Sequence, residues 1–362
     1  MEGEISYFWT CLSVDHRATT VRTFMKTLIL VILVNIQALL IHSFLMQSIV
    51  SKLCTHTRGL RKNCLCMTTA AMVEEKPLFS VAPMMQYTDR HQRAFQRIMS
   101  KKTILYTEMV TTSALIHSDK TDRFLRADLP VEEPVVLQLG GSNPEHMKEA
   151  SKLAHKYGYN EINLNIGCPS EKVSGAGCFG AVLFLNPPLV SELALAVGEA
   201  TGKPATVKCR IGVDGHETYE ELHSFIRTVS EVGKVTHFII HARIAVLGKR
   251  FSPKDNRTIP PLKYDVVYQL IRDFPHLCFS LNGGVDNMEL VSELLQREGG
   301  GLHGVMVGRA VVNNPYAWST VDSTLYGIKD PGKNYVKCIC IYMTFSFLFC
   351  FDSIILSMLI IT

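Results

Sequence analysis

The chain has 362 residues, of which 47% are apolar and 19% charged, with 37 Lys and Arg against 33 Asp and Glu. This composition excludes a disordered chain, a collagen-like repeat and a highly basic histone-like protein. Residues 77–327 carry 26 basic and 26 acidic residues, so any nucleic-acid binding by this region must use local patches of charge.

Residues 1–76 form an N-terminal extension whose composition differs from that of the middle region. The segment 27–51 contains no Asp, Glu, Lys or Arg and is long enough to span a membrane. No acidic residue occurs between His16 and Val73, which also suits an organelle transit peptide. We expect either a plastid or mitochondrial targeting segment or a membrane anchor. An extension foreign to the functional protein is a third interpretation, and cytoplasmic or membrane-associated protein are the alternative localisations.

Residues 77–327 alternate eight short apolar runs with amphipathic stretches. This alternation predicts an α/β fold, the (β/α)8 TIM barrel. A doubly wound open sheet is the alternative, but the glycine-rich first turn that it needs is missing. The predicted strands are Leu78–Ala82, Ile104–Glu108, Val135–Leu139, Glu161–Asn165, Ala205–Arg210, Phe238–His241, Cys278–Asn282 and Gly304–Gly308. The clearest predicted helices are Pro144–Tyr157, Leu189–Thr201, Tyr219–Val232, Tyr264–Phe274 and Asn287–Glu298.

Almost every predicted strand ends in a group that can bind or react. Chemistry in a barrel gathers at the carboxyl ends of the strands, so we expect these groups to share one site. They are Met84, Glu108, Gln138, Asn165 with Cys168, Lys208, His241, Asn282 with Gly283 and Gly284, and Gly308 with Arg309.

The ends of the last two strands predict a phosphate-binding cup. Gly283, Gly284 and Gly308 let backbone N–H groups approach an anion, and Arg309 adds charge and bidentate hydrogen bonds. Lys208 can form a Schiff base or supply a fixed positive charge, and the sequence leaves both open.

Cys168 lies just past the fourth predicted strand, on a loop fixed by Gly167 and Pro169. A thiol at this face can act as a nucleophile or as a general acid, and its ordinary pKa of about 8.5 keeps it protonated at neutral pH. A buried structural thiol is the ordinary alternative, and Cys178 in the same loop is a rival.

Basic residues cluster in two places, and the second follows the sixth predicted strand on the catalytic rim. There it could steer a polyanion to the mouth of the barrel, although a solvated loop is the alternative. The first cluster is Arg90, Arg93, Arg97, Lys101 and Lys102, and the second is Arg243, Lys249, Arg250, Lys254, Arg257 and Lys263.

Residues 328–362 form an apolar tail that carries, from Cys338 onward, a single charge at Asp352. Its length suits a membrane span, and a read-through or alternative exon explains it equally well.

No metal site is predicted, because the Cys64-Leu65-Cys66 and Cys338-Ile339-Cys340 pairs lack the partner pairs that zinc needs.

The middle region resembles the tRNA-dihydrouridine synthases, and most closely their DusA-type branch. The similar stretches keep their order over about residues 78–327. They are Val81-Ala82-Pro83-Met84-Met85, Tyr87-Thr88-Asp89-Arg90, Leu105-Tyr106-Thr107-Glu108-Met109-Val110, Leu137-Gln138-Leu139-Gly140-Gly141, Glu161-Ile162-Asn163-Leu164-Asn165, Gly167-Cys168-Pro169-Ser170, Val207-Lys208, Arg210-Ile211-Gly212, His241-Ala242-Arg243, Ser252-Pro253-Lys254, Asn256-Arg257, Asn282-Gly283-Gly284 and Met306-Val307-Gly308-Arg309.

The resemblance implies an FMN-binding barrel that reduces a uridine in tRNA to 5,6-dihydrouridine, with NADPH as the electron donor. Cys168 would then give the proton to C5 after hydride passes from flavin N5 to C6. It implies flavin contacts by Pro83, Met84, Met85, Gln138, Lys208 and His241, and phosphate contacts by Asn282, Gly283, Gly284, Gly308 and Arg309. The resemblance also implies that Asn165, Lys254 and Arg257 contact the RNA. It implies that the modified uridines are at positions 20 and 20a of the tRNA D-loop.

Two departures from the family pattern affect the expected activity. Gly180-Ala181-Val182-Leu183 replaces a usual Gly-Ala-Cys-Leu-like run, and the tail 328–362 replaces the family's helical RNA-binding domain. We therefore expect the chain to bind FMN as a monomer and to modify tRNA poorly. Two alternative functions stay open, a truncated flavin-binding isoform held at a membrane through 27–51 or 338–362, and a flavin oxidoreductase acting on a free pyrimidine.

Overall fold

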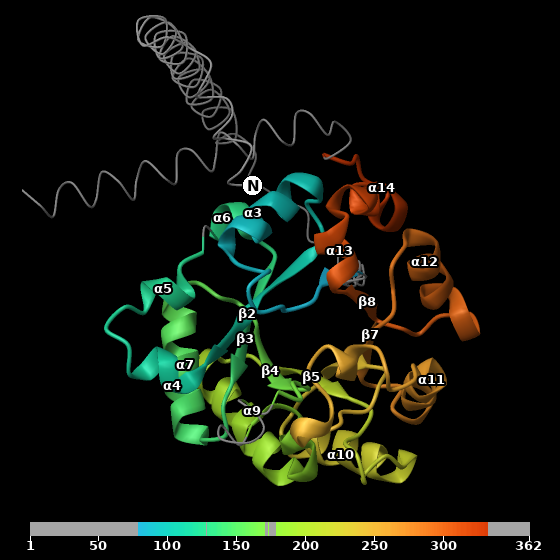
Figure 1. Cartoon of the computed structure of the whole chain (residues 1–362). Coiled ribbons are helices and arrows are strands. Elements are labelled where there is room, and N and C mark those ends of the chain that lie inside the picture. Colours follow the sequence, from blue (N-terminus) through green and yellow to red (C-terminus); the bar gives the residue numbers. More distant parts are fainter. Residues whose placement is uncertain (1–78, 128, 171–172, 174–178, 332–362) are drawn as a thin grey trace, which may run out of the picture. The chain divides into compact units, whose positions relative to one another are not determined.

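The computed structural model describes residues 79–127, 129–170, 173 and 179–331. Its eight parallel strands close into a barrel in which each strand pairs with the next along the chain and the last pairs with the first (Figure 1). The predicted TIM barrel is confirmed. The strands are β1 (Phe79–Val81), β2 (Ile104–Thr111), β3 (Val135–Gly140), β4 (Ile162–Ile166), β5 (Thr206–Arg210), β6 (His237–His241), β7 (Cys278–Asn282) and β8 (Gly304–Val307).

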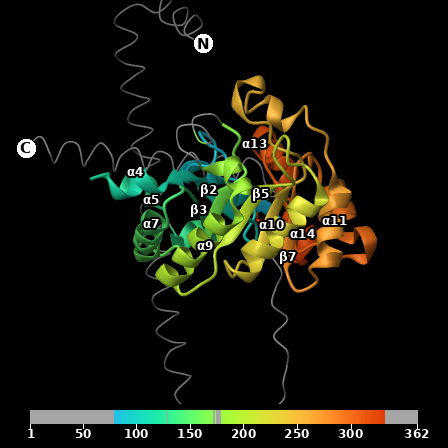
Figure 2. The same cartoon turned by 90° about the horizontal axis from the view of Figure 1, so that it is seen from below.

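Helices surround the strands on the outside of the barrel (Figures 1 and 2). The five helices predicted most clearly are confirmed to within two residues at each end. The α-helices are α3 (Arg90–Met99), α4 (Thr112–Ile116), α5 (Asp122–Leu125), α6 (Leu129–Glu132), α7 (Pro144–Lys156), α9 (Pro187–Thr201), α10 (Tyr219–Glu231), α11 (Tyr264–Asp273), α12 (Met288–Gln296), α13 (Arg309–Asn313) and α14 (Val321–Tyr326). The 3-10 helices are η1 (Gly180–Leu185), η2 (Gly248–Arg250), η3 (Asp255–Arg257), η4 (Arg297–Gly299) and η5 (Pro315–Trp318).

Local sequence fixes where several of these helices begin. The carboxylate of Asp89 accepts a hydrogen bond from the backbone N–H of Gln92 at 2.8 Å and caps α3. Asn143 caps α7 in the same way, followed by proline at the first helical position. Thr218 and Glu221 form a reciprocal capping box at the start of α10. Each helix therefore starts where the strand–helix alternation requires it.

The interior of the barrel holds its own small apolar cluster, separate from the larger core between strands and helices. The cluster fills the centre, so the barrel is packed rather than open. Chemistry is thereby confined to the end where the polar strand termini gather. The buried members of the cluster are Ala82, Tyr106, Val136, Ile239 and Met306.

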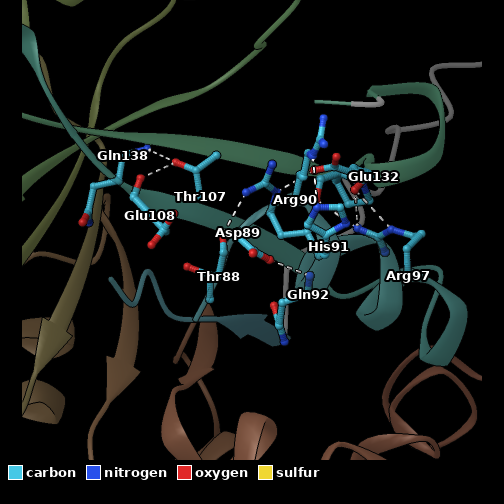
Figure 3. Close-up of polar contacts among 12 residues, drawn as sticks. Thr88, Asp89, Arg90, His91, Gln92, Arg97, Thr107, Glu108, Glu132 and Gln138 are labelled. Atoms are coloured by element: carbon cyan, nitrogen blue, oxygen red, sulfur yellow. Dashed lines mark hydrogen bonds and ion pairs between the residues drawn. The ribbon is translucent and has the colours of Figure 1, made fainter. Parts of the chain in front are cut away.

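The first basic cluster of the sequence is largely structural, and α3 was not among the predicted helices. Arg93 is 4% exposed, pairs with Glu132 at 2.5 Å and donates to the Thr88 carbonyl at 2.8 Å. Arg97 donates to the backbone carbonyls of Ser100, Thr103, Glu132 and Pro134, and Figure 3 shows it beside Glu132. Burial lowers the pKa of Arg97 to about 10. These two arginines hold α3 against the barrel.

The end of the described chain packs against its beginning. The indole of Trp318 stacks on Phe79 with ring centroids 5.4 Å apart, and the Tyr326 hydroxyl accepts a hydrogen bond from the Phe79 N–H at 3.2 Å. Asp322 is fully buried in α14, and Ser100 Oγ donates to its carboxylate at 2.5 Å. The backbone N–H groups of the two residues after Ser100 donate to it as well, so α14 is tied to the loop before β2.

Among the described residues, no helix is both long and apolar enough to cross a bilayer. The apolar segments 27–51 and 338–362 lie outside the described residues, so the targeting and anchoring predictions for them stay predictions. The domain boundaries expected at 76 and 327 also stay predictions.

Candidate active site

The polar strand ends identified in the sequence converge, because all eight strands run parallel around one closed barrel. Gln138, Asn165, Lys208, His241 and Asn282 lie within β3, β4, β5, β6 and β7 respectively. Glu108 lies within β2 and Arg309 begins α13, whereas Met84, Cys168, Gly283, Gly284 and Gly308 lie on the loops that follow the strands. The expectation that one end of the barrel collects these groups is confirmed by the fold.

A ladder of side-chain amides crosses β3 and β4 at this end. Gln138 is 1% exposed, and its amide donates to Asn163 Oδ1 and accepts from Asn165 Nδ2, both at 2.8 Å. Asn165 Oδ1 in turn accepts the backbone N–H of Gly167 at 3.1 Å and of Cys168 at 3.0 Å. Asn165, which was predicted to touch RNA, therefore also fixes the start of the Cys168 loop.

Cys168 is a free, half-buried thiol whose loop is closed by backbone contacts. The Ala181 N–H donates to the Cys168 carbonyl at 2.9 Å. A Cβ on Gly180 would lie 2.6 Å from the same carbonyl oxygen, and Gly180 has φ +75°. The run Gly180–Leu183 thus needs glycine at its first position, because a side chain there would displace the Cys168 backbone. Cys178, the rival thiol, lies outside the described residues.

Lys208 places a half-buried positive charge at the strand ends. Its Nζ donates to Asn282 Oδ1 at 2.9 Å, and the Asn282 amide is itself fixed by donating to the Met306 carbonyl at 2.8 Å. Burial, followed by the charge of Arg210, lowers the pKa of Lys208 to about 8. A cation whose partner is a neutral amide is suited to an electron-rich or anionic ligand.

His241 is held neutral beside two glycines. Burial, followed by the charges of Arg210 and Lys208, lowers the pKa of His241 well below its usual value. A Cβ on Gly283 would lie 2.6 Å from His241 Cδ2, and one on Gly284 would lie 2.4 Å from the side chain of Leu262. Gly283 and Gly284 both have positive φ, of 115° and 74°, so the backbone bends here in a way that only glycine permits without strain.

The last strand ends beside the turn that follows the first. A Cβ on Gly308 would lie 3.5 Å from Met84 Sδ, so the two loops are in contact. Arg309 is exposed and begins α13, and its charge lowers the pKa of His241, Arg243 and Arg257. The predicted phosphate cup therefore has glycine backbone and a guanidinium at adjacent strand ends.

The turn after β1 is fixed by hydrogen bonds at its base and its tip. The hydroxyl of the buried Thr88 accepts the Met84 N–H at 3.0 Å, and the carboxylate of Glu108, within β2, accepts the Gln86 N–H. Figure 3 shows Glu108 beside Thr107 and Gln138, with the Thr107 hydroxyl accepting the Gln138 N–H at 3.1 Å. Pro83 and Met84 are partly buried in this turn, whereas the side chain of the next residue, Met85, is 56% exposed.

A buried arginine that the sequence analysis assigned no role joins two loops of the site. Arg210 is 4% exposed and donates to the backbone carbonyls of Gly167 at 3.0 Å, Ile244 at 2.7 Å and Asn256 at 2.9 Å. Burial, partly offset by Cys168, lowers its pKa to about 10. Strand alternation was the available signal, because Arg210 lies two residues after Lys208 and faces the same side of β5.

The predicted RNA-contact residues Lys254 and Arg257 are exposed on the loop after β6. Asn256 between them is fully buried and exchanges hydrogen bonds with the backbone of Val246 at 2.8 and 2.9 Å. Burial lowers the pKa of Arg257, and the positive charge of Arg309 lowers it further. Among the described residues, no group of three His, Cys, Asp or Glu side chains is arranged to hold a metal.

A parallel barrel whose strand ends carry glycines, cations and a loop thiol has the layout of the barrel enzymes, in which the chemistry lies at the carboxyl ends of the strands. Residues 80–344 match the family model described as dihydrouridine synthase (Dus). The chain belongs to the dihydrouridine synthase family.

Relatives of this chain carry a specific name. It is 50% identical over 254 residues, which are 70% of this chain and 75% of the relative, to the tRNA-dihydrouridine(20/20a) synthase of Vibrio vulnificus (strain CMCP6). It is 49% identical over 267 residues to the enzyme of that name in Escherichia coli (strain K12), covering 72% of this chain and 75% of the relative. The DusA-type resemblance is confirmed.

A solved structure, a complex of 2-naphthoyl-CoA reductase, superposes with a TM-score of 0.52 at 10% identity, covering 67% of this chain and 49% of that chain. At this identity the likeness shows the barrel fold alone.

Proposed function

We propose that this chain reduces a uridine at position 20 or 20a of tRNA to 5,6-dihydrouridine, with FMN as its bound cofactor and NADPH as the electron donor. The observation that carries the proposal is the convergence of Cys168, Lys208 and the amide ladder at one barrel end in a chain 49% identical to a tRNA-dihydrouridine(20/20a) synthase. The free-pyrimidine and membrane-held alternatives have no comparable observation in their favour.

The residues at the strand ends fit a flavin mononucleotide. Side chains at Gly283 and Gly284 would collide with His241 and Leu262, so the packing of the protein itself requires glycine at both positions. The bare glycine backbone presents N–H groups that a phosphate can approach closely. Arg309 beside Gly308 supplies the charge for a phosphate. Lys208 would face the electron-rich edge of the ring system, with Gln138, His241, Pro83, Met84 and Met85 as further contacts.

When bound, FMN reduced by NADPH supplies the hydride that C6 of the uridine accepts. The Cys168 S–H then gives its proton to C5, so the C5=C6 double bond becomes a single bond and the thiolate regains a proton from solvent. Asn165 fixes the thiol by holding the Cys168 N–H. Arg257 and Lys254 would bind phosphates near a uridine that has left its stack, because a stacked base cannot reach the barrel end.

The test measures dihydrouridine by nucleoside mass spectrometry. Unmodified tRNA transcript is incubated with the full chain, FMN and NADPH. Wild type should form dihydrouridine, Cys168→Ala should lose at least about 100-fold in rate, and Cys278→Ala, a half-buried thiol at the opposite end of the barrel, should match wild type.

Two results would contradict the proposal in different ways. If wild-type protein that is yellow with bound flavin forms no dihydrouridine, the proposed activity is wrong. If Cys168→Ala and wild type react at equal rates, Cys168 is not the proton donor, but the proposed activity still holds.

A further inference from the structure

Hydrogen bonds close the turn between β1 and α3 at its base. The backbone N–H groups of Tyr87 and Thr88 both donate to the Met84 carbonyl, at 3.1 and 3.0 Å. The Thr88 hydroxyl is fully buried and bonds back to the Met84 backbone. The base of the turn is thus closed, and its tip, residues 85–87, has a fixed direction.

The tip contains a strained residue. Gln86 has φ +66°, a left-handed conformation that costs a residue with a Cβ roughly 1 kcal/mol or more. Its N–H donates to the carboxylate of Glu108, which offsets this cost. Strain that is held in place in this manner is typical of positions where function dictates the backbone.

Both neighbours of the strained Gln86 face solvent. Met85 is 56% exposed and Tyr87 is 55% exposed. Among the described residues, the other exposed large apolar side chains occur singly, at Val131, Leu185, Leu195, Val232, Ile259 and Tyr316. Single exposed apolar residues are ordinary, but two within three positions at the carboxyl end of a barrel strand indicate a contact surface.

The charges around Tyr87 indicate the chemistry of its partner. Tyr87 follows β1, Arg309 follows β8, which pairs with β1, and Arg257 lies on the loop after β6. Both guanidinium groups are exposed, so a partner that meets the Tyr87 ring has two arginines at the same end of the barrel. Flat apolar faces joined by negative charges describe a single-stranded nucleic acid, in which bases stack on aromatic rings and phosphates bind arginine.

We infer that Tyr87 is a base-stacking residue that receives the nucleobase next to the uridine entering the barrel. This inference rests on the proposed function, because a tRNA substrate brings that neighbour to the site. When the uridine leaves its stack, the adjacent base loses a stacking partner and Tyr87 takes its place. Glu108 is a positioning residue that acts through Gln86.

The first test measures binding of a fluorescently labelled, unmodified tRNA transcript to the full chain by anisotropy. Tyr87→Ala should raise Kd roughly tenfold, within the range known for loss of one stacked base. Tyr87→Phe and Tyr87→Trp should bind as wild type, and Tyr87→Leu should resemble Tyr87→Ala, because stacking needs an aromatic ring. Val232→Ala, on an exposed apolar side chain after α10, is the matched control and should leave Kd unchanged.

The second test reports stacking directly. A transcript with 2-aminopurine beside position 20 loses fluorescence when that base stacks, so wild type should quench it and Tyr87→Leu should not. Quenching that persists in Tyr87→Leu overturns the inference.

The positioning role of Glu108 has its own readout. Glu108→Ala should raise Kd as Tyr87→Ala does, the double variant should add nothing further, and Glu108→Gln, which keeps an acceptor oxygen, should restore binding. Additive losses would refute the link through Gln86. Flavin content is measured for each variant, and equal content in all of them separates loss of RNA contact from loss of cofactor.

The outcomes separate this inference from the function on which it rests. A wild type that modifies tRNA while Tyr87→Ala binds and turns over equally well overturns the stacking role alone. A wild type that neither binds nor modifies the transcript overturns both.

Discussion

Replacing Lys208 by methionine should stabilise the flavin-free protein at neutral pH while removing activity. Burial of the ammonium lowers its pKa from 10.5 to about 8. At 1.36 kcal/mol per pKa unit, this shift corresponds to a cost of about 3 kcal/mol to the fold when the group is charged. Part of the side chain stays in contact with solvent, so we expect about 2 kcal/mol of this cost to be measurable.

The sign of the pH dependence follows from the direction of the shift. Below about pH 8 Lys208 is charged in both states, and the folded state bears the whole cost. Between about pH 8 and pH 10.5 the unfolded chain binds the additional proton, so wild-type stability rises with pH relative to the variant. The penalty disappears above about pH 10.5, where both states are neutral.

Urea unfolding of wild type and Lys208→Met at pH 7 and pH 10, without flavin, measures this difference. The variant also leaves Asn282 Oδ1 without its Lys208 donor, which costs about 1 kcal/mol at either pH. That loss does not titrate, so it cancels when the two pH values are compared. Wild type should gain about 2 kcal/mol on the variant between pH 7 and pH 10. A difference that is flat, or that falls with pH, would refute the assignment of Lys208 as a destabilising charge kept for its ligand.

Three further perturbations test other parts of the structure. Gly180→Ala places a Cβ 2.6 Å from the Cys168 carbonyl at φ +75°, so single-turnover reduction should slow while stability falls by about 1 kcal/mol or more in urea. Asp322→Asn turns an amide N–H toward donors at 2.5 and 2.7 Å and should lower unfolding free energy by about 1–3 kcal/mol; an unchanged denaturation midpoint would contradict it. Arg93→Met alone should cost about 3–5 kcal/mol, and Arg93→Met with Glu132→Leu should recover most of it, as a double-mutant cycle would show.

The strands were predictable because buried parallel strands read as short apolar runs. The runs at Ile104, Val135, Cys278 and Gly304 begin the observed strands at the same residues. β2 continues to Thr111, beyond the predicted end at Glu108, past an irregularity in its pairing with β3. The end of a strand depends on its hydrogen bonds to the neighbouring strands, and the sequence alone does not show which residues pair.

The helix α3 was missed for a different reason. Its sequence, Arg90–Met99, carries three arginines and was interpreted as a basic cluster. Arg93 is buried because a carboxylate from α6, Glu132, meets it 39 positions later in the chain. From the sequence alone, a buried charged residue whose partner is distant in the chain cannot be distinguished from a charged residue on the surface.

The candidate site was predicted well where a residue ends a strand, because the barrel rule places strand ends together. Arg210 and Tyr87 were not assigned roles. Arg210 binds three backbone carbonyls on loops. Every residue has a backbone carbonyl, so these partners cannot be identified from residue types. Tyr87 lies exposed beside Gln86, which has a positive φ, and residue type reveals neither the exposure nor the backbone conformation.

The pairing of β1 with β8 has a consequence for synthesis of the chain. Phe79 pairs with Val305, which lies 226 positions later. At about 5–20 residues per second, translation leaves β1 waiting roughly 10–45 s for its second neighbour. Until then the free edges of β1 and of the newest strand can pair with other chains. Closure therefore comes late, and expression conditions that shield nascent chains, such as slow growth or added chaperone, should raise the yield of soluble barrel more than changes at the active site do.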